Sequence, residues 1–484
     1  MPHIKAHLNY TQFPPCVKGE STPPLTICNT MLPILDIFII LLFLLFTLFH
    51  GLRIAKKDEK PVDYLLGGRA LTLPAFVATT VSTWYGGILG VGEYAWQYGI
   101  SNWIVFCVPY YVGALLFALV ISKRARNGES LTIPHRFESH YGKRASICSA
   151  ILIFLTTVPG AYVLMMGTLC SVSFGLSVTL GIVLTAIFVV IYLWRGGFKA
   201  VVKTDALQFA LMFGGFIFLT AWLLIGFGLE PLHQLPETHL QISGGQSFAS
   251  ILVWYVIALS TLAEPNFFQR TFAAKTPEIA RNGLLISIGC WCVFDMMTTL
   301  CGLYARALLP DLQNPVQAFP DLAITVLPTG IIGLFFAGLF ATVLSTLDSS
   351  LFTAATTIGR DLWPQSIKTS LTNTAKTRIG LIIGAILAAA IAILAGSVIK
   401  IWEIFGSVAA ASLLIPILGT YYAPFKMSSK GAIVLMILGS LSTLAWFALS
   451  QVFDFLPKIR PLFIGAAVAI LCFAVDKVIS KCKN

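Results

Sequence analysis

The chain has 484 residues, of which 57% are hydrophobic and only 11% are charged, and its mean hydropathy is +0.84. A soluble globular domain carries about 25% charged residues, so this composition excludes a soluble enzyme, a disordered protein and a secreted disulfide scaffold. The formal net charge is +11, from 32 Lys and Arg against 21 Asp and Glu. The positions of these cations decide whether they indicate nucleic-acid binding or membrane topology.

Apolar runs long enough to cross a bilayer follow one another along almost the whole chain. We predict thirteen spans, at 32–52, 74–96, 100–122, 146–172, 175–194, 205–228, 248–268, 283–307, 323–352, 379–397, 400–423, 431–450 and 461–478. They form a single membrane domain over 32–478, between an N-terminal tail (1–31) and a C-terminal tail (479–484). The N-terminal tail is not expected to be a signal peptide, because no basic stretch precedes the first apolar run and no small-residue cleavage site follows it.

The basic residues alternate between the two sides of this predicted domain. With the N-terminus outside, the inner loops hold 26 Lys and Arg and the outer segments hold 6, which accounts for all 32. Because positive charge accumulates in cytoplasmic loops, this split predicts an extracytoplasmic N-terminus, a cytoplasmic C-terminus and a multi-pass protein of the cell membrane. The positive charge therefore reflects the topology of a protein embedded in the lipid bilayer and does not indicate a nucleic-acid partner. No obligatory protein partner is expected.

The ten cysteines indicate no disulfide framework or metal site. Most of them lie inside apolar runs and no CxxC pair occurs, so we expect them to serve packing. Cys16 and Cys28 lie in the N-terminal tail and would be able to pair if that tail is extracytoplasmic, which the sequence leaves open.

The second predicted span has an unusual density of small and hydroxyl residues. It reads VATTVSTWYGG over 77–87, followed by Gly90, Gly92 and Glu93. Such residues weaken a helix and let backbone carbonyls turn inward, as a discontinuous helix around an ion requires. Close helix packing through Gly and Ser is the alternative interpretation.

The seventh predicted span contains a proline next to a carboxylate. Glu264 and Pro265 follow Thr261 near the end of the run. Proline removes a backbone donor and breaks the local helix, and a carboxylate at this depth needs a partner or a proton. In the alternative interpretation, Glu264 is solvated at the membrane interface.

The ninth predicted span carries a row of hydroxyl groups. Thr342, Ser345, Thr346, Ser349 and Thr353 share one helical face. Membrane Ser and Thr often bond back to their own helix, but a row of neutral oxygens also suits a hard cation that must bind and leave quickly.

Both interrupted spans occupy the first position of a set of five, the second to sixth spans and the seventh to eleventh. Interrupted helices at matching positions of two halves are the sequence signature of an inverted-repeat secondary transporter. The two repeats are predicted over about 74–228 and 248–423. No GxxxxGK[ST], HExxH, GxSxG or GxGxxG motif occurs, so neither an ATP-driven pump nor an enzyme is indicated.

Three stretches resemble the signatures of the solute:sodium symporter family. They are GGFKAVVKTDALQ at 196–208, QRTFAAK at 269–275 and ATVLSTLDSSLFTAATTIGRD at 341–361. Their order and the number of predicted spans match the family over nearly the whole chain past residue 30. The resemblance implies an all-α, leucine-transporter-like fold of about 13 transmembrane helices, with two five-helix inverted repeats and flanking helices.

The resemblance also implies one sodium site between the broken second span and the ninth span. Aligned through Asp361, the paired hydroxyl ligands of the family fall on Ser345 and Thr346, and a carbonyl ligand falls on Thr342. Aligned through 86–90, the carbonyl ligands of the broken helix fall on Val81 and Trp84.

The family signature also places Asp205 close to the ion on its cytoplasmic side. There it would serve as a relay or electrostatic partner. In the alternative interpretation, Asp205 is an interfacial acid that pairs with Lys203 or Arg195.

The substrate is less clearly indicated. In the sugar carriers of the family, a Tyr and a Trp precede the QRT motif at the positions that Ser260 and Thr261 occupy here, and Ile257 replaces an upstream Asn. A hexose is therefore disfavoured. The pattern at 83–87 and the Phe-Gln-Arg at 268–270 are similar to the choline-transporting branch, in which aromatic rings can hold a quaternary ammonium by cation–π contact.

This chain has Trp84 but carries Glu264 where the choline-transporting branch has a second Trp, which suggests a cationic or zwitterionic solute. The candidate substrate-binding residues are Thr83, Trp84, Tyr85, Trp254, Thr261 and Glu264. Trp96, Tyr110 and Tyr111 are further possible pocket walls.

The leading hypothesis is sodium-driven symport of a small polar organic solute by alternating access, with sodium as the co-transported ion. Two alternatives remain open. One is a proton-coupled or uncoupled permease that uses Glu264, Asp205 or Glu93. The other is a transport-dead sensor with the same fold.

Overall fold

The structure is a computed structural model that describes residues 31–53, 61–128, 130–363, 371–453 and 459–482. The N-terminal tail up to residue 30, with Cys16 and Cys28, lies outside the described residues. Within those residues the regular structure is helical apart from one isolated bridge between Leu71 and Ala274. The all-α class is therefore confirmed.

The helices of the first half are α1 (Ile34–Arg53), α2 (Pro61–Leu66), α3 (Leu73–Trp84), α4 (Ile88–Tyr98), α5 (Val108–Leu116), α6 (Ser122–Asn127), α7 (Ile133–Tyr141), α8 (Lys143–Thr157), α9 (Gly160–Phe174) and α10 (Val178–Phe227). Those of the second half are α11 (Glu237–Leu240), α12 (Phe248–Ala258), α13 (Pro265–Ala273), α14 (Pro277–Leu308), α15 (Ala318–Val326), α16 (Ile331–Thr356), α17 (Asn373–Ala395), α18 (Val398–Gly419), α19 (Ser429–Val452) and α20 (Pro461–Cys482). Helix α20 thus includes most of the predicted C-terminal tail.

Eleven helical segments of the described residues are long and apolar enough to cross a membrane. The predicted span 175–194 corresponds to a shorter apolar helix, Val178–Trp194, and the predicted span 74–96 is divided between α3 and α4. The polytopic architecture is confirmed, while the count of thirteen spans stays a prediction.

The second span is interrupted where the sequence predicts it. Helix α3 ends at Trp84, a 3₁₀ turn covers Tyr85–Gly87, and α4 begins at Ile88. A Cβ atom on Gly86 would lie 2.1 Å from Oγ1 of Thr346. The glycine thus lets the broken helix approach the side chain of Thr346 in α16 more closely than any other residue would allow.

The seventh span is interrupted as well, and Glu264 lies at the interruption. Helix α12 ends at Ala258, a 3₁₀ turn covers Leu259–Ala263, and α13 begins at Pro265. Glu264 has extended backbone angles and accepts a hydrogen bond from the backbone N–H of Asn266, so it caps α13. Proline at the first helical position suits this start, because its missing N–H would have no intrahelical partner there.

The GG signature forms a sharp bend inside α10. Gly197 has φ 56° and ψ −161°, and a Cβ atom there would lie 2.7 Å from the ring of Tyr64. Only glycine meets both conditions. The segment that follows the bend carries Asp205 along α16, with which α10 packs.

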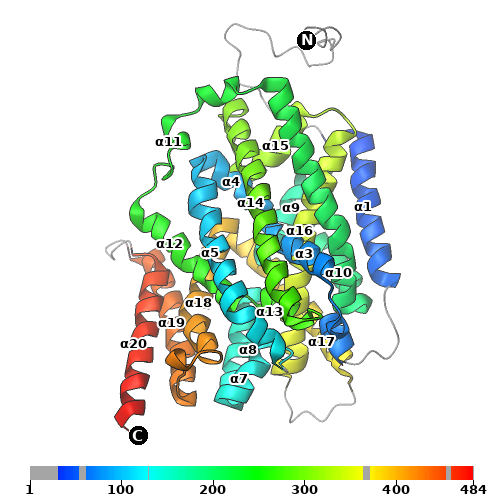
Figure 1. The fold of residues 1–484 in the computed structure, drawn as a ribbon. Helices are drawn as coiled ribbons and strands as arrows, with labels where there is room; N and C mark the ends of the chain where they lie inside the picture. The colour runs from blue at the N-terminus through cyan, green and yellow to red at the C-terminus, as the bar shows by residue number, and fades with distance from the viewer. Residues whose placement is uncertain (1–30, 54–60, 129, 364–370, 454–458, 483–484) are drawn as a thin grey trace, which may run out of the picture.

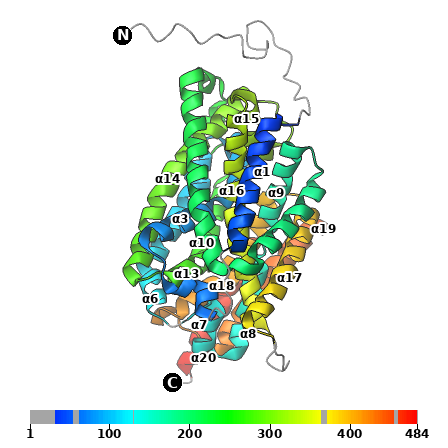
Figure 2. The same cartoon turned by 90° about the vertical axis from the view of Figure 1, so that its right-hand side faces the viewer.

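Helix α16 forms the centre of the bundle (Figures 1 and 2). In its spanning window 89% of residues are buried inside the protein, against 22–56% for the other candidate spans, so its hydroxyl groups face other helices and not lipid. Asp36 of α1 fixes the start of α16 by accepting hydrogen bonds from the N–H groups of Gly330 and Gly333 at 2.7 and 2.6 Å.

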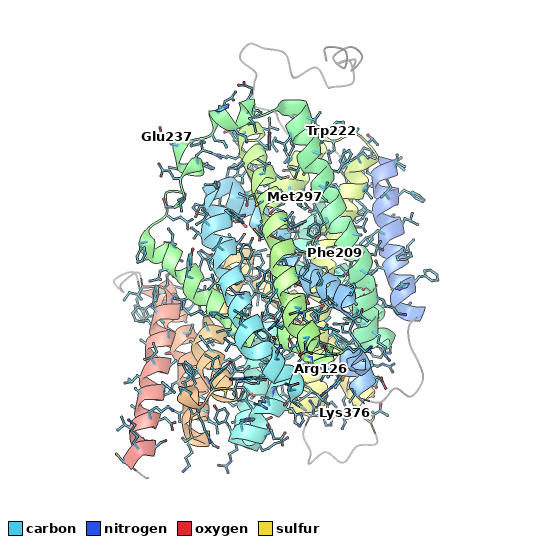
Figure 3. All side chains as sticks on the ribbon, in the orientation of Figure 1. Arg126, Phe209, Trp222, Glu237, Met297 and Lys376 are labelled. Atoms are coloured by element: carbon cyan, nitrogen blue, oxygen red, sulfur yellow. The ribbon has the colours of Figure 1, made fainter. Side chains whose placement is uncertain are left out.

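The two ends of the bundle carry different segments. Helices α11 and α15 lie at one end, and α6, α7 and the end of α20 lie at the other (Figures 1 and 2). Figure 3 places Glu237 and Trp222 at the first end and Arg126 and Lys376 at the second. At the second end, the bridge between Leu71 and Ala274 joins the segment just before α3 to the residue that follows α13.

Candidate substrate and ion site

A cavity of about 230 Å³ lies between the two interrupted spans and is also lined by residues of α5, α8, α9, α14 and α18. Its polar lining includes Thr80, Thr83, Tyr85, Tyr111, Ser260, Thr261, Glu264, Asn266, Arg270, Asp295 and Thr346. Its aromatic lining includes Trp84, Phe106, Tyr110, Tyr162, Phe267, Trp402 and Phe405. A cleft with a largely apolar surface, aromatic walls and convergent polar groups is typical of a small-molecule site.

Five of the six residues predicted to bind substrate line this cavity: Thr83, Trp84, Tyr85, Thr261 and Glu264. The sixth, Trp254, lies behind the wall. Its ring packs against Phe106, with the two centroids 4.9 Å apart, and against Tyr94. Trp254 therefore supports the cavity through Phe106.

Trp84 is the centre of an aromatic cluster at the end of α3. Its ring centroid lies 4.8 Å from that of Phe267, 5.5 Å from that of Trp291 and 5.6 Å from that of Tyr110. These rings come from α13, α14 and α5, so the cluster holds the broken second span against three other elements. Aromatic faces of this kind also attract cations.

Glu264 presents a carboxylate to the same cavity. One oxygen, Oε1, accepts from the backbone N–H of Asn266 at 3.2 Å and from Nδ2 of Asn266 at 3.0 Å. Both donors are neutral, so the negative charge is not balanced by its hydrogen bonds. A half-buried carboxylate without a cationic hydrogen-bond donor calls for a cation or a proton.

The residues predicted to bind sodium meet where α16 touches the broken second span. Oγ1 of Thr346 donates to the backbone carbonyl of Thr83 at 2.5 Å, and Oγ of Ser345 donates to Oδ1 of Asp205 at 2.5 Å. The hydroxyl of Thr342 bonds to the carbonyl of Gly338 in its own helix at 2.7 Å, so only its backbone oxygen would remain as a ligand.

The two carbonyl candidates, Val81 and Trp84, both belong to α3 of the broken span. Val81 is fully buried, and its carbonyl accepts from the indole N–H of Trp291 at 3.5 Å. Trp84 is the last residue of α3, where the interruption leaves carbonyls without intrahelical donors. The structure thus brings the hydroxyl of Thr346 to a carbonyl of the broken span, that of Thr83, while the carbonyl of Val81 accepts from Trp291 of α14.

A buried ion pair adjoins this region. The guanidinium of Arg270 lies 3.6 Å from Oδ2 of Asp205, with side-chain exposures of 1% and 0%. Thr79 donates to the same oxygen of Asp205, and Arg270 donates to Oγ of Ser349 at 2.7 Å. Asp348, also fully buried, accepts from the hydroxyl of Tyr192 at 3.1 Å.

Arg270 corrects one part of the sequence analysis. The 26 basic residues counted above for the inner loops include Arg270, but this residue lies inside α13 and lines the cavity. An arginine inside an apolar span is rare and usually functional, and its position in the QRT motif was the signal that could have identified it.

Asp295 is the second site residue that the sequence analysis does not single out. It lies within α14, inside the predicted span 283–307, and is 4% exposed. An ionisable residue inside a span is by itself a functional signal, and this rule would have found it. Glu93, by contrast, interacts with Gln97 of its own helix and is not part of the cavity wall.

An all-helical membrane protein with two interrupted helices around a central cavity has the architecture of a secondary transporter. The sequence pattern of the "Sodium:solute symporter family" matches residues 64–439. The chain is 28% identical to a sodium/pantothenate symporter of Haemophilus influenzae over 79% of this chain and 84% of that protein. It is 25% identical to the sodium/proline symporter of Escherichia coli, over 85% of this chain and 87% of that protein.

Solved structures agree on the fold. A sodium-coupled sialic acid symporter in a substrate-bound outward-open state superposes with a TM-score of 0.77 at 16% identity, covering 92% of this chain and 97% of that one. A transporter of the nucleobase-cation-symport-1 family superposes with a TM-score of 0.54 at 13% identity, covering 87% and 96%. These likenesses support the leucine-transporter-like arrangement of the helices.

The chain belongs to the sodium:solute symporter family. It is a sodium-coupled symporter of the plasma membrane and not an enzyme, and sodium is its co-transported ion. The local similarity to the choline-transporting branch stays a prediction.

Proposed function

We propose that this symporter couples sodium entry to the uptake of a small organic solute that carries a positive group, either a cation or a zwitterion. The observation that carries the proposal is the Glu264 carboxylate in the aromatic cavity, where its hydrogen-bond donors are neutral. A positive group on the solute would balance this charge, and Trp84 and Tyr110 would contribute cation–π attraction.

The sodium site in this proposal consists of the carbonyls of Val81, Trp84 and Thr342 and the hydroxyls of Ser345 and Thr346. What supports it is the direct contact between Thr346 and the carbonyl of Thr83, which brings the hydroxyl row of α16 to the interruption. Asp205, which accepts from Ser345, adds negative charge beside the site.

The coupling between sodium binding and solute binding follows from the position of this sodium site beside the substrate cavity. Sodium would hold the broken second span against α16, and the same span carries Thr83, Trp84 and Tyr85 to the substrate cavity. An ion that binds better when these elements are in contact stabilises the state in which the substrate wall is complete. Alternating access would then move the two repeats, 74–228 and 248–423, relative to each other.

The test is uptake into proteoliposomes with and without an inward sodium gradient. A panel of amines, amino acids and carboxylates, including proline and pantothenate because relatives carry them, is offered as competitor. A ligand that binds the folded protein also raises its thermal stability, by about 2.7 kcal/mol at a hundredfold excess over Kd. We expect sodium-dependent stabilisation by positively charged or zwitterionic compounds and none by simple carboxylates.

The Glu264→Gln variant isolates the charge, because the amide keeps the shape of the side chain. We expect it to abolish or strongly weaken solute transport while leaving sodium binding nearly intact. Glu403→Gln, which changes an acid that pairs with Arg460 away from the cavity, is the matched control. Normal transport by Glu264→Gln would remove this residue from the site, and a changed pH dependence at unaltered affinity would make it a proton site.

A further inference from the structure

A second carboxylate faces the same cavity from a different helix. Asp295 of α14 lines the cavity and is 4% exposed. Its Oδ1 accepts from Sγ of Cys107 at 3.0 Å and its Oδ2 accepts from the hydroxyl of Tyr111. Both donors are neutral, and no cationic side chain pairs with Asp295 among the residues that the structure describes.

We propose that Asp295 is a second cation-binding residue of this cavity, and that the transported solute is a small organic dication, such as an aliphatic diamine. The proposal rests on the function proposed above, in which Glu264 receives one positive group. Asp295 receives the other.

The charge balance of the centre supports a dication. Asp205, Asp348, Glu264 and Asp295 are four buried or cavity-facing carboxyls, and Arg270 is the one cation among them. If all five are ionised, they carry a formal charge of −3. One sodium ion and one doubly charged solute neutralise this charge, whereas sodium and a singly charged solute leave an excess that low-dielectric surroundings make costly.

The wall between the two carboxylates is aromatic, which suits an aliphatic spacer. Phe267 lies three residues after Glu264, Tyr110 directly precedes the Tyr111 that bonds to Asp295, and both rings line the cavity. Both rings also pack against that of Trp84, with centroid distances of 4.8 and 5.6 Å. A diamine would therefore place its methylene groups on apolar rings and its ammonium groups at the two acids.

Two hydroxyls in the same wall are further candidate contacts for a ligand with several N–H donors. Oγ1 of Thr261 and the hydroxyl of Tyr85 are buried, at 1% and 5% residue exposure, and find no partner among the described residues. Both residues line the cavity. An ammonium group has three N–H donors, so it can bond to a carboxylate and still satisfy a neighbouring hydroxyl.

The test compares matched amines in binding and uptake by the full-length protein in sodium. A series of α,ω-diamines of increasing length is measured against monoamines of the same carbon number, by thermal shift and by competition. We expect one diamine length to bind at least tenfold more tightly than its monoamine. The Asp295→Asn variant should lose this preference and keep its monoamine affinity, whereas Glu264→Gln should lose both.

Two further variants test whether Asp295 has only a structural role. Tyr111→Phe removes the hydroxyl that bonds to Oδ2 of Asp295, so the ratio of diamine to monoamine affinity should rise. Asp321→Asn changes another buried acid, in α15 and outside the cavity wall, and should leave the diamine preference as it is.

The outcomes separate this inference from the proposed function. Sodium-dependent binding of monoamines or zwitterions through Glu264, with no preference for any diamine, overturns the role of Asp295 and leaves the proposed function standing. A diamine preference that survives in Asp295→Asn overturns the inference too. If no positively charged compound binds in sodium, the proposed function itself fails.

Discussion

A guanidinium nitrogen of Arg270 lies 3.6 Å from Oδ2 of Asp205 in the centre of the bundle, and both side chains are almost completely buried. Arg270 also donates to the hydroxyls of Ser349 and Thr83, so a single guanidinium joins α13 to α10, α16 and α3. Such a pair loses most of its Coulomb energy to desolvation, so its value lies in orienting these elements and not in added stability.

The charges around this pair predict that replacing Arg270 destabilises the protein more than replacing Asp205 does. Arg270→Gln leaves Asp205 and Asp348 buried without their cation, whereas Asp205→Asn leaves Arg270 with the nearby carboxylate of Asp348. Removing one partner of a buried pair costs about 3–5 kcal/mol when the other charge is left uncompensated. We therefore expect Arg270→Gln to lower the apparent melting temperature and folded yield in detergent far more than Asp205→Asn does. Equal losses would contradict a shared role of the two acids.

The hydroxyls of α16 give a prediction for the ion. Ser345→Ala or Thr346→Ala removes one oxygen from the proposed sodium site, at a cost of about 1.5–3 kcal/mol by analogy with a charge-assisted hydrogen bond. The sodium concentration for half-maximal uptake should rise roughly ten- to a hundredfold. Ser349→Ala should matter less, because its hydroxyl bonds to Arg270.

Thr356→Ala is the matched control for these two variants. Thr356 also lies on α16, but its hydroxyl donates to the carbonyl of Thr353 in its own helix at 2.9 Å. Its removal should leave the sodium dependence unchanged. An unchanged sodium dependence in both Ser345→Ala and Thr346→Ala would exclude these residues as ligands.

Much of this architecture follows from local sequence signals. Gly, Ser and Thr near 77–87 predict the interruption of the second span, and Pro265 predicts that of the seventh, because each effect acts within a few residues. The hydroxyl face of α16 follows from helical periodicity in the same way. These features needed no knowledge of which helices are neighbours.

The partners of the buried charges could not be read from the sequence. Asp295 meets Tyr111 and Cys107 across 184 and 188 residues of chain, and Arg270 meets Asp205 across the two halves of the fold. Such contacts depend on tertiary packing. A count of basic residues also cannot distinguish Arg270, buried in α13, from a solvated loop cation, which is why the sequence analysis misplaced it.

The orientation in the membrane stays a prediction and can be tested with single cysteines. In a cysteine-free background, a cysteine at Glu237, exposed in α11, should react with an impermeant thiol reagent in intact cells. One at Lys430, exposed at the start of α19, should react only after permeabilisation. We expect this labelling pattern because Lys and Arg accumulate at the end of the bundle that carries α6 and the start of α19, and such an end is cytoplasmic. The reverse labelling pattern would invert the predicted topology.

Gly86 provides the most local test of the contact between the broken second span and α16. An alanine there would place its Cβ atom 2.1 Å from Oγ1 and 2.2 Å from Cβ of Thr346, and neither atom belongs to a flexible side-chain end that can move aside. The turn must therefore separate from α16, which breaks the contact between Thr346 and the carbonyl of Thr83. Over-packing of this kind costs about 1–3 kcal/mol.

Because the same contact would complete the sodium site, we expect Gly86→Ala to lose sodium-dependent stabilisation and uptake together, while still folding. Gly289→Ala is the control, since Gly289 lies within α14 and a Cβ atom there would meet nothing within 4 Å. A helix-interior Gly→Ala change at such an open position is neutral or stabilising by about 0.5–1 kcal/mol. Thermal shift with and without sodium measures both variants. If Gly86→Ala keeps the sodium response of the unmodified protein, the approach of the broken span to α16 is not what binds the ion.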